Sequence, residues 1–84
     1  MHCAIYKGNK RPDDYLYIEN ENDFSRVPKA LLDMMGKLHF VISLELSADR
    51  QLAQADVHQV MRQLTDQGYY LQMPPKVRDL SLEQ

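Results

Sequence analysis

One cysteine and three histidines are the side chains of this sequence best suited to nucleophilic or acid–base chemistry. A nucleophilic site needs a thiolate, a base within hydrogen-bond reach and a group that orients the base. Cys3 shares strand parity with Ile5, which favours a packed apolar position, and His2 points to the opposite face. His39 and Glu45 share a face of a predicted strand, but six residues separate them by about 20 Å. The residues therefore predict no catalytic constellation, and an enzyme is the less favoured class.

Metal and cofactor binding lack their usual sequence patterns. The densest acidic segments are residues 13–14 and residues 19–23, and neither has the spacing of a calcium loop or a zinc site. The three glycines stand singly at predicted turns and helix ends, so the sequence has no glycine-rich loop for a phosphate. We therefore expect no metal and no cofactor.

Tyrosines near basic side chains form the pattern that best fits a binding surface. Alternation along an extended strand puts Tyr15 and Tyr17 on the same face, and we expect that face to be the more solvent-exposed one. Arg26 is added because it is polar, has no capping role and stands beside a predicted helix start. The candidate binding residues, with the four tyrosines expected on one sheet face, are Tyr6, Lys7, Tyr15, Tyr17, Arg26 and Tyr70.

Tyrosine and arginine are typical anchors of protein–protein interfaces, so the leading hypothesis is a non-enzymatic binding or regulatory module that meets a protein partner through this face. Two alternatives stay open. Tyrosines on an open sheet beside Lys7, Lys10 and Arg11 also suit single-stranded nucleic acid such as RNA, although the formal net charge of -2 disfavours phosphate binding. A small hydrolase or nuclease would need His39 or His58 within hydrogen-bond reach of a carboxylate in a cleft.

Length and composition describe one small globular domain. Of the 84 residues, 44% are hydrophobic and 26% are charged, which is typical of a folded chain with a single modest core. Cys3 is the only cysteine, so no disulfide can form within the chain, which favours a reducing compartment. The sequence starts without a signal-peptide pattern, and no apolar run approaches the roughly 20 residues that cross a bilayer. We therefore expect a cytoplasmic protein outside the membrane.

Strand-like alternation and helix-like spacing divide the sequence into six elements. The clearest strand is 38–46, where five apolar residues alternate with their neighbours, so we expect one face of this strand to lie in the core. Ser25 is expected to cap the first helix and Asp56 the second, and a glycine follows each helix, as is typical of helix ends. The predicted strands are 3–7, 14–19, 38–46 and 69–73, and the predicted helices are 28–35 and the segment between Asp56 and Gly68.

The order of these elements is β-β-α-β-α-β. Two strands that share a sheet and are joined by a helix prefer a right-handed parallel crossover. We therefore expect a two-layer α/β (α+β) fold, with a mixed four-stranded sheet and both helices packed on one face. This domain is expected to span residues 1–75, and residues 76–84, which have no periodic pattern, are expected to form a flexible tail.

Five segments, spread over nearly the whole chain, resemble one known family. They are Cys3-Ala4-Ile5-Tyr6-Lys7, Tyr15-Leu16-Tyr17-Ile18-Glu19, Asp23-Phe24-Ser25-Arg26-Val27-Pro28, Ala55-Asp56-Val57 and Gly68-Tyr69-Tyr70-Leu71-Gln72-Met73-Pro74-Pro75. Together they resemble the YcgL domain family, small bacterial proteins of unknown function. The resemblance implies a small α/β fold and a bacterial cytosolic setting, and it brings no catalytic residue.

Overall fold

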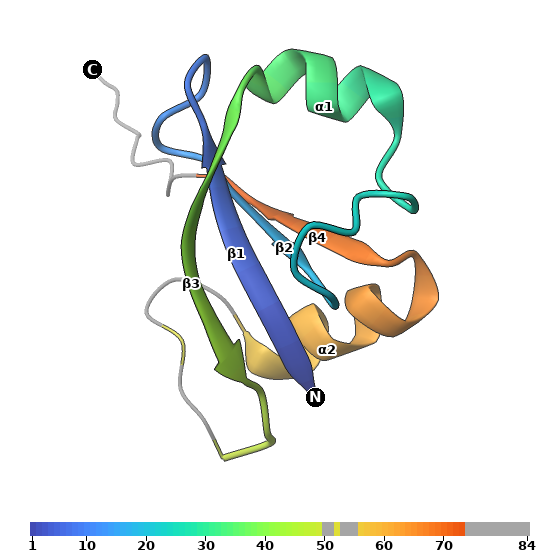
Figure 1. The fold of residues 1–84 in the computed structure, drawn as a ribbon. Coiled ribbons are helices and arrows are strands. Elements are labelled where there is room, and N and C mark those ends of the chain that lie inside the picture. Colours follow the sequence, from blue (N-terminus) through green and yellow to red (C-terminus); the bar gives the residue numbers. More distant parts are fainter. Residues whose placement is uncertain (50–51, 53–55, 74–84) are drawn as a thin grey trace, which may run out of the picture.

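Two strands, a helix, a third strand, a second helix and a last strand follow one another along the chain (Figure 1). This is the order that the sequence predicts. The computed structural model describes residues 1–49, 52 and 56–73, so the predicted tail lies outside the described residues. The elements are β1 (His2–Gly8), β2 (Tyr15–Ile18), α1 (Lys29–Met35), β3 (Leu38–Glu45), α2 (Val57–Asp66) and β4 (Tyr69–Gln72).

The four strands form one sheet in the order β3-β1-β2-β4, and every pair of neighbours is antiparallel. The prediction of a mixed sheet is therefore wrong. Because β2 and β3 both run antiparallel to β1, they are parallel to each other, as the crossover rule expects, but β1 lies between them. α2 then carries the chain from the β3 edge to the β4 edge, so no two parallel strands become neighbours.

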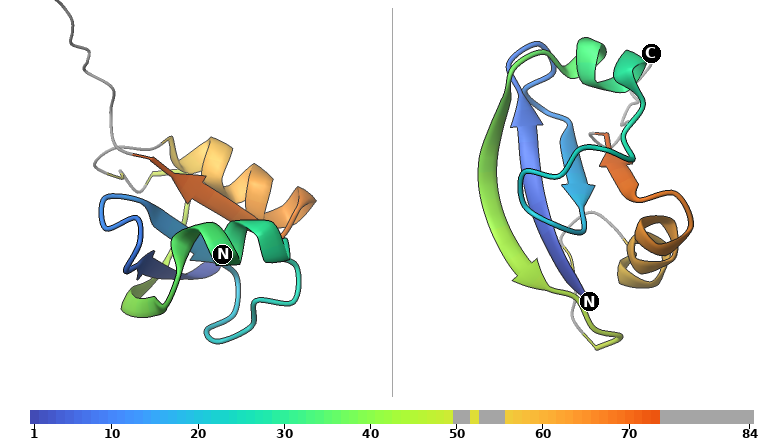
Figure 2. Two further views of the ribbon diagram at one scale, coloured as in Figure 1. Left: turned by 90° about the horizontal axis from the view of Figure 1, so that it is seen from above. Right: turned by 45° about the vertical axis from the view of Figure 1, so that its right-hand side comes forward.

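The two helices lie on opposite faces of the sheet (Figure 2). Met35 of α1 packs in a core cluster with Ala4 and Tyr6 of β1, whereas α2 packs Val60 and Leu64 against the other face of the same strand. The prediction of both helices on one face is therefore wrong. Because β1 presents apolar side chains to both sides, each face needs its own cover to keep apolar surface out of water.

A β-bulge in β3 divides the apolar side chains of this strand between the two faces. Ile5 of β1 pairs with Ile42. The next residue, Tyr6, pairs with Phe40, which leaves one extra residue of β3 between the two pairs. The first half of β3 therefore contributes to the core under α1 and the second half to the core under α2. The expectation of one continuous buried face over 38–46 is wrong, because strict alternation does not survive an extra residue.

A side chain caps the start of α2 but not the start of α1. α2 starts after Asp56, whose carboxylate accepts a hydrogen bond from the backbone N–H of His58 at 2.9 Å, as predicted. α1 starts after Pro28 without a side-chain cap, so the predicted cap by Ser25 is wrong. Ser25 instead donates its hydroxyl hydrogen to Asp23 at 2.7 Å, in the loop before the helix. Neither helix of the described part of the chain is long and apolar enough to cross a bilayer.

Candidate functional site

Three of the predicted tyrosines, in β2 and β4, lie on the sheet face that α2 covers. Tyr17 is only 5% exposed, and its ring meets the ring of Tyr70 edge to face at a centroid distance of 5.5 Å. The Tyr17 hydroxyl donates a hydrogen bond to Gln72 Oε1 at 2.8 Å. Tyr15 is half-buried, with Lys7 Nζ 5.9 Å from its ring centroid. The expectation of a solvent-exposed tyrosine face is wrong, because α2 packs over it.

Tyr6 lies on the other face, under α1, and is 4% exposed. The register explains this position, because Tyr6 pairs with Leu16 and so shares the face opposite to that of Tyr17. Its hydroxyl accepts a hydrogen bond from the backbone N–H of Asn22 at 2.8 Å, and its ring lies 4.9 Å from the ring of Phe24. The four predicted tyrosines are therefore divided between two cores, and they do not form one surface.

The division of the tyrosines between two cores also removes the surface on which the nucleic-acid alternative would stack bases. Stacking of single-stranded bases needs exposed aromatic rings on an open sheet. The predicted tyrosines instead pack in the two cores, Tyr6 on the side of α1 and the other three on the side of α2. Arg11, one of the basic residues near the tyrosines, lies with its Nε 3.2 Å from Oδ2 of the buried Asp14, which offsets the charge of the guanidinium.

Burial sets the chemistry of Tyr17 as well as its packing. Removal from water disfavours the charged phenolate and raises the pKa of Tyr17 to about 12, with smaller contributions from Cys3, Tyr70 and Tyr15. The phenol therefore stays protonated at neutral pH and acts as the hydrogen-bond donor to Gln72. This is the arrangement of a core residue rather than of an acid or base in a site.

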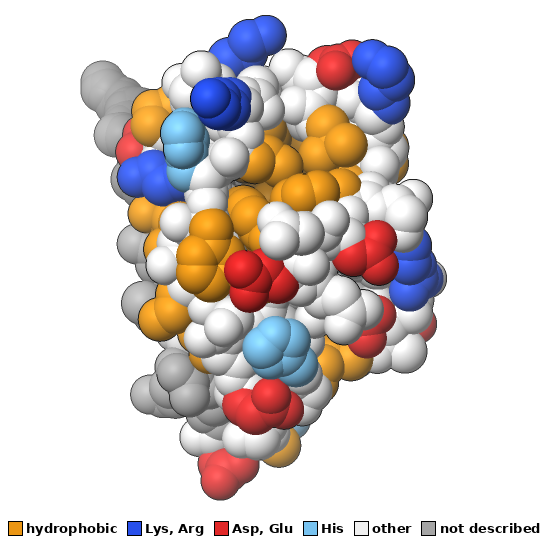
Figure 3. All heavy atoms as spheres, viewed as in Figure 1, with side chains coloured by type: hydrophobic (Ala, Val, Ile, Leu, Met, Phe, Trp, Pro, Cys, Tyr) orange, Lys and Arg blue, Asp and Glu red, His pale blue; other side chains and the backbone are white. Residues whose placement is uncertain are grey.

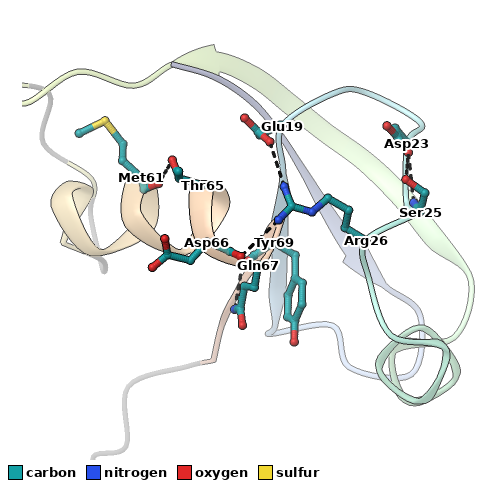
Figure 4. Close-up of polar contacts among 9 residues, drawn as sticks. All are labelled: Glu19, Asp23, Ser25, Arg26, Met61, Thr65, Asp66, Gln67 and Tyr69. Atoms are coloured by element: carbon teal, nitrogen blue, oxygen red, sulfur yellow. Dashed lines mark hydrogen bonds and ion pairs between the residues drawn. The ribbon is translucent and has the colours of Figure 1, made fainter.

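Arg26 makes polar contacts with two segments of the chain (Figure 4). Its Nη2 donates a hydrogen bond to the carbonyl oxygen of Asp66 at the end of α2, at 3.3 Å, and its Nη1 lies 3.7 Å from Glu19 Oε1. The side chain is half exposed. A shallow hollow around it is lined by Glu19, Asn20, Asp23, Ser25, Arg26 and Gly68.

The contacts of Arg26 tie the loop before α1 to the turn between α2 and β4. The side chain lies directly over Gly68, where a Cβ atom would come within 2.5 Å of Arg26 Nε. Both ends of the guanidinium already have partners within the protein. The arrangement therefore explains Arg26 as a brace between two segments far apart in the sequence.

Gly68→Ala is expected to lower the free energy of unfolding through two separable effects. The φ of Gly68 is +89°, a conformation that costs an L-residue about 1 to 2 kcal/mol. The added methyl group would also collide with the Arg26 side chain. Urea unfolding of the single and double variants should show that Arg26→Gly, which removes the Cβ, Cδ and Nε atoms in the collision, removes the second effect and leaves the first. Equal costs of Gly68→Ala in both backgrounds would exclude the proposed collision.

The described residues do not include the histidine–carboxylate pair that the hydrolase alternative requires. Within the described residues neither His39 nor His58 forms an ion pair with a carboxylate. A pair that the sequence analysis missed joins His2 Nδ1 to Glu45 Oε1 at 3.5 Å, because β1 and β3 are neighbours. Its side chains are 49% and 72% exposed, so water surrounds them, whereas a catalytic pair is normally shielded from it. No group of residues in the described part of the chain could hold a metal ion.

The β3 edge patch, which we define as Phe40, Val41 and Ile42, is the longest run of exposed large apolar residues in the part of the chain that the structure describes. These side chains are 49%, 44% and 48% exposed, and they are consecutive in a strand at the end of the sheet. Figure 3 shows hydrophobic side chains in the middle of the α1 face and along the side where β3 lies. Sequence reasoning expected one face of residues 38–46 to lie in the core and so missed this surface, because the sequence shows no simple pattern for a bulge or for an edge position.

The β3 edge patch has basic residues on one side along the chain and acidic residues on the other. Lys37 and His39 precede the patch, and Glu45 and Asp49 follow it, and all four are exposed. No other strand of the described residues pairs with the outer edge of β3, so its outward backbone N–H and C=O groups have no strand partner there. The patch therefore combines apolar side chains with an open backbone ladder.

Comparison with known proteins assigns the chain to a family. The YcgL domain matches residues 3–75. A YcgL domain-containing protein of Proteus mirabilis is 49% identical over 80 residues, which cover 95% of this chain and 82% of that protein. Protein YcgL of Escherichia fergusonii is 46% identical over the same share of both chains.

A third relative carries the matching segment within a much longer chain. A protein of Nitrosococcus oceani named putative HAD-like hydrolase is 55% identical over 71 residues, which are 84% of this chain but only 19% of that protein. All three relatives come from bacteria. The family and the relatives confirm the resemblance found in the sequence segments. The chain belongs to the YcgL domain family.

Proposed function

We propose that this domain is a non-enzymatic binding module that docks a protein partner along the outer edge of β3. The observation that carries the proposal is the β3 edge patch, in which three consecutive large apolar side chains are each almost half exposed. Consecutive residues of a strand point to both sides of the sheet, so a partner strand laid beside β3 would contact all of them. The tyrosine face is no longer part of the proposal, since α2 covers it.

The backbone of β3 supplies the second argument. Proteins normally protect an exposed edge strand with prolines or with charged residues, because the open ladder otherwise recruits another chain. The segment 40–44 has neither, so the protection of this strand is limited to the bulge and to His39 and Glu45 near its two ends. An extended partner segment can add to such an edge, with main-chain hydrogen bonds giving affinity and alternate side chains giving specificity.

The relative from Nitrosococcus oceani fits a module that works beside another polypeptide. There the matching segment forms 19% of a longer chain named putative HAD-like hydrolase. A domain that is useful when fused to a larger protein does not need an active site of its own. We also place the module in the cytoplasm, for which the single cysteine is the support.

A photo-crosslinking amino acid at position 40 tests the proposal in living bacteria. Phe40 is replaced by the crosslinker, and the matched control carries the same crosslinker at Gln59, an exposed residue of α2. We expect a discrete crosslinked product from position 40 and none from position 59. Adding Ile42→Lys should remove the product, because a charge at the centre of the edge opposes the burial of the patch.

Two results would contradict the proposed function. One is the same set of products from both positions, which would mean random collision. The other is no product from position 40 in cells that contain the protein at its natural level. Mass spectrometry of the product identifies the partner.

A further inference from the structure

We propose that the occupant of the β3 edge is a second copy of this chain, paired antiparallel through β3 so that two four-stranded sheets become one. The inference rests on the proposed function and names its partner. Antiparallel pairing of identical strands is a twofold, self-complementary arrangement, in which each copy offers the same surface. A twofold axis normal to the sheet also keeps the α1 faces of the two copies on one side and their α2 faces on the other.

The position of the patch within β3 favours self-pairing. Residues 40–42 occupy the middle of the strand Leu38–Glu45. When two copies pair antiparallel about the middle of the strand, the patch of one copy lies against the patch of the other. A patch near one end of the strand would instead meet polar residues of the second copy. The apolar surfaces would therefore be buried together and leave water.

The charged residues on either side of the patch also favour antiparallel pairing of the two β3 strands. Lys37 and His39 stand before it and Glu45 and Asp49 after it. Antiparallel pairing brings the basic end of each strand to the acidic end of the other. Parallel pairing would instead place like charges side by side, which costs free energy. The charges of Lys37 and Glu45 therefore favour the antiparallel dimer, in which Lys37 would add to the contacts that Glu45 already makes with the Met1 amino group at 3.3 Å and with His2 at 3.5 Å.

The length of the contact sets the strength of the dimer. An eight-residue strand is about 27 Å long, so the interface is small and belongs with the weak, reversible ones. We expect a dissociation constant in the micromolar range, which rises with salt because the end charges are exposed to screening. The dimer is thus populated at high local concentration and dissociates on dilution.

Analytical ultracentrifugation of the purified chain tests the inference. Over a concentration series that reaches the millimolar range we expect the mass to rise from that of one chain to that of two. Ile42→Lys should raise the dissociation constant at least tenfold, or about 1.4 kcal/mol. Gln59→Lys, which adds the same charge on α2, should leave it unchanged. Circular dichroism confirms that both variants are folded.

A charge-swap experiment tests the orientation. The variant Lys37→Glu/His39→Glu is acidic at both ends of the patch, and Glu45→Lys/Asp49→Lys is basic at both ends. We expect each variant alone to dimerise at least tenfold more weakly than the wild type, and an equimolar mixture to recover the dimer. Recovery is absent if the ends do not meet across the interface.

The outcomes separate this inference from the proposed function. A wild-type chain that stays monomeric at millimolar concentration, or a dimer that Ile42→Lys does not weaken, overturns the second copy as the occupant. In that case a crosslinked product from position 40 that contains a different protein still supports the proposed function. Absence of both the dimer and the product overturns both.

Discussion

Gly8→Ala is expected to lower the free energy of unfolding by about 2 to 3 kcal/mol, a large share of the stability of so small a domain. Gly8 lies near the end of β1, where the last turn of α1 crosses it. A Cβ atom there would collide with the carbonyl oxygen and carbon of Met35. These are backbone atoms and cannot rotate away. Relief would require α1 to move, which would break the hydrogen bond from Lys10 N to Met35 O at 3.1 Å.

Urea unfolding of matched variants checks this expectation. Ser43→Ala, at an exposed position of β3, is the control and should change the free energy of unfolding by less than about 0.5 kcal/mol. Met35→Ala should not rescue Gly8→Ala, because alanine keeps the backbone and the Cβ atom that cause the collision. The double variant should be less stable still, since Met35 is fully buried. A Gly8→Ala protein as stable as the control would refute the close contact.

Gly8 also illustrates what the sequence could and could not predict. Composition places Gly8 at the start of a polar turn, and a hairpin between β1 and β2 does follow it. Its contact with α1 depends on residues 27 positions away and leaves no local pattern. The six elements were predictable because alternation, helical spacing, the Asp56 cap and the glycines after the helices are all local signals.

Long-range arrangement was the part that could not be predicted. The pattern of Leu16 and Tyr17 correctly puts them on opposite faces of β2, but a period of two does not say which face is wet. Here the side chains on both faces of β2 are shielded from water, because they pack in the two core clusters. A strand rich in tyrosine can therefore be predicted from the sequence to be exposed, although its rings pack in the core.

The exposure of β3 was mispredicted for a related reason. One face of the most apolar strand of the sequence was expected to lie in the core, yet β3 is an edge strand with a bulge, and its central residues are almost half exposed. Strand order depends on which strands the helical connections bring together, and the sequence contains no direct signal for it. Arg26 was predicted as a binding residue because it had no capping role, and in the structure its side chain contacts Glu19 and the backbone of Asp66.

Raising the pH from 10 to 12 is expected to destabilise the wild type by about 2 kcal/mol relative to Tyr17→Phe. The ordinary pKa of a tyrosine is 10.0, and burial raises the pKa of Tyr17 to about 12 in the folded protein. The folded state therefore holds the phenolic proton more tightly than the unfolded state. This stabilisation is fully present below pH 10 and is lost as the pH rises through 12.

The comparison with Tyr17→Phe isolates this one phenol, because every other tyrosine and lysine titrates in both proteins. Below pH 10 the wild type should be the more stable by about 1 kcal/mol, since its hydroxyl donates to Gln72 Oε1 at 2.8 Å. Urea midpoints measured between pH 9 and pH 12 should then converge and cross as the wild type loses its advantage. Parallel curves would mean that Tyr17 ionises at the same pH in the folded and unfolded chains. That result would contradict the burial of its hydroxyl under α2, and with it the argument that moves the candidate site from the tyrosines to the β3 edge.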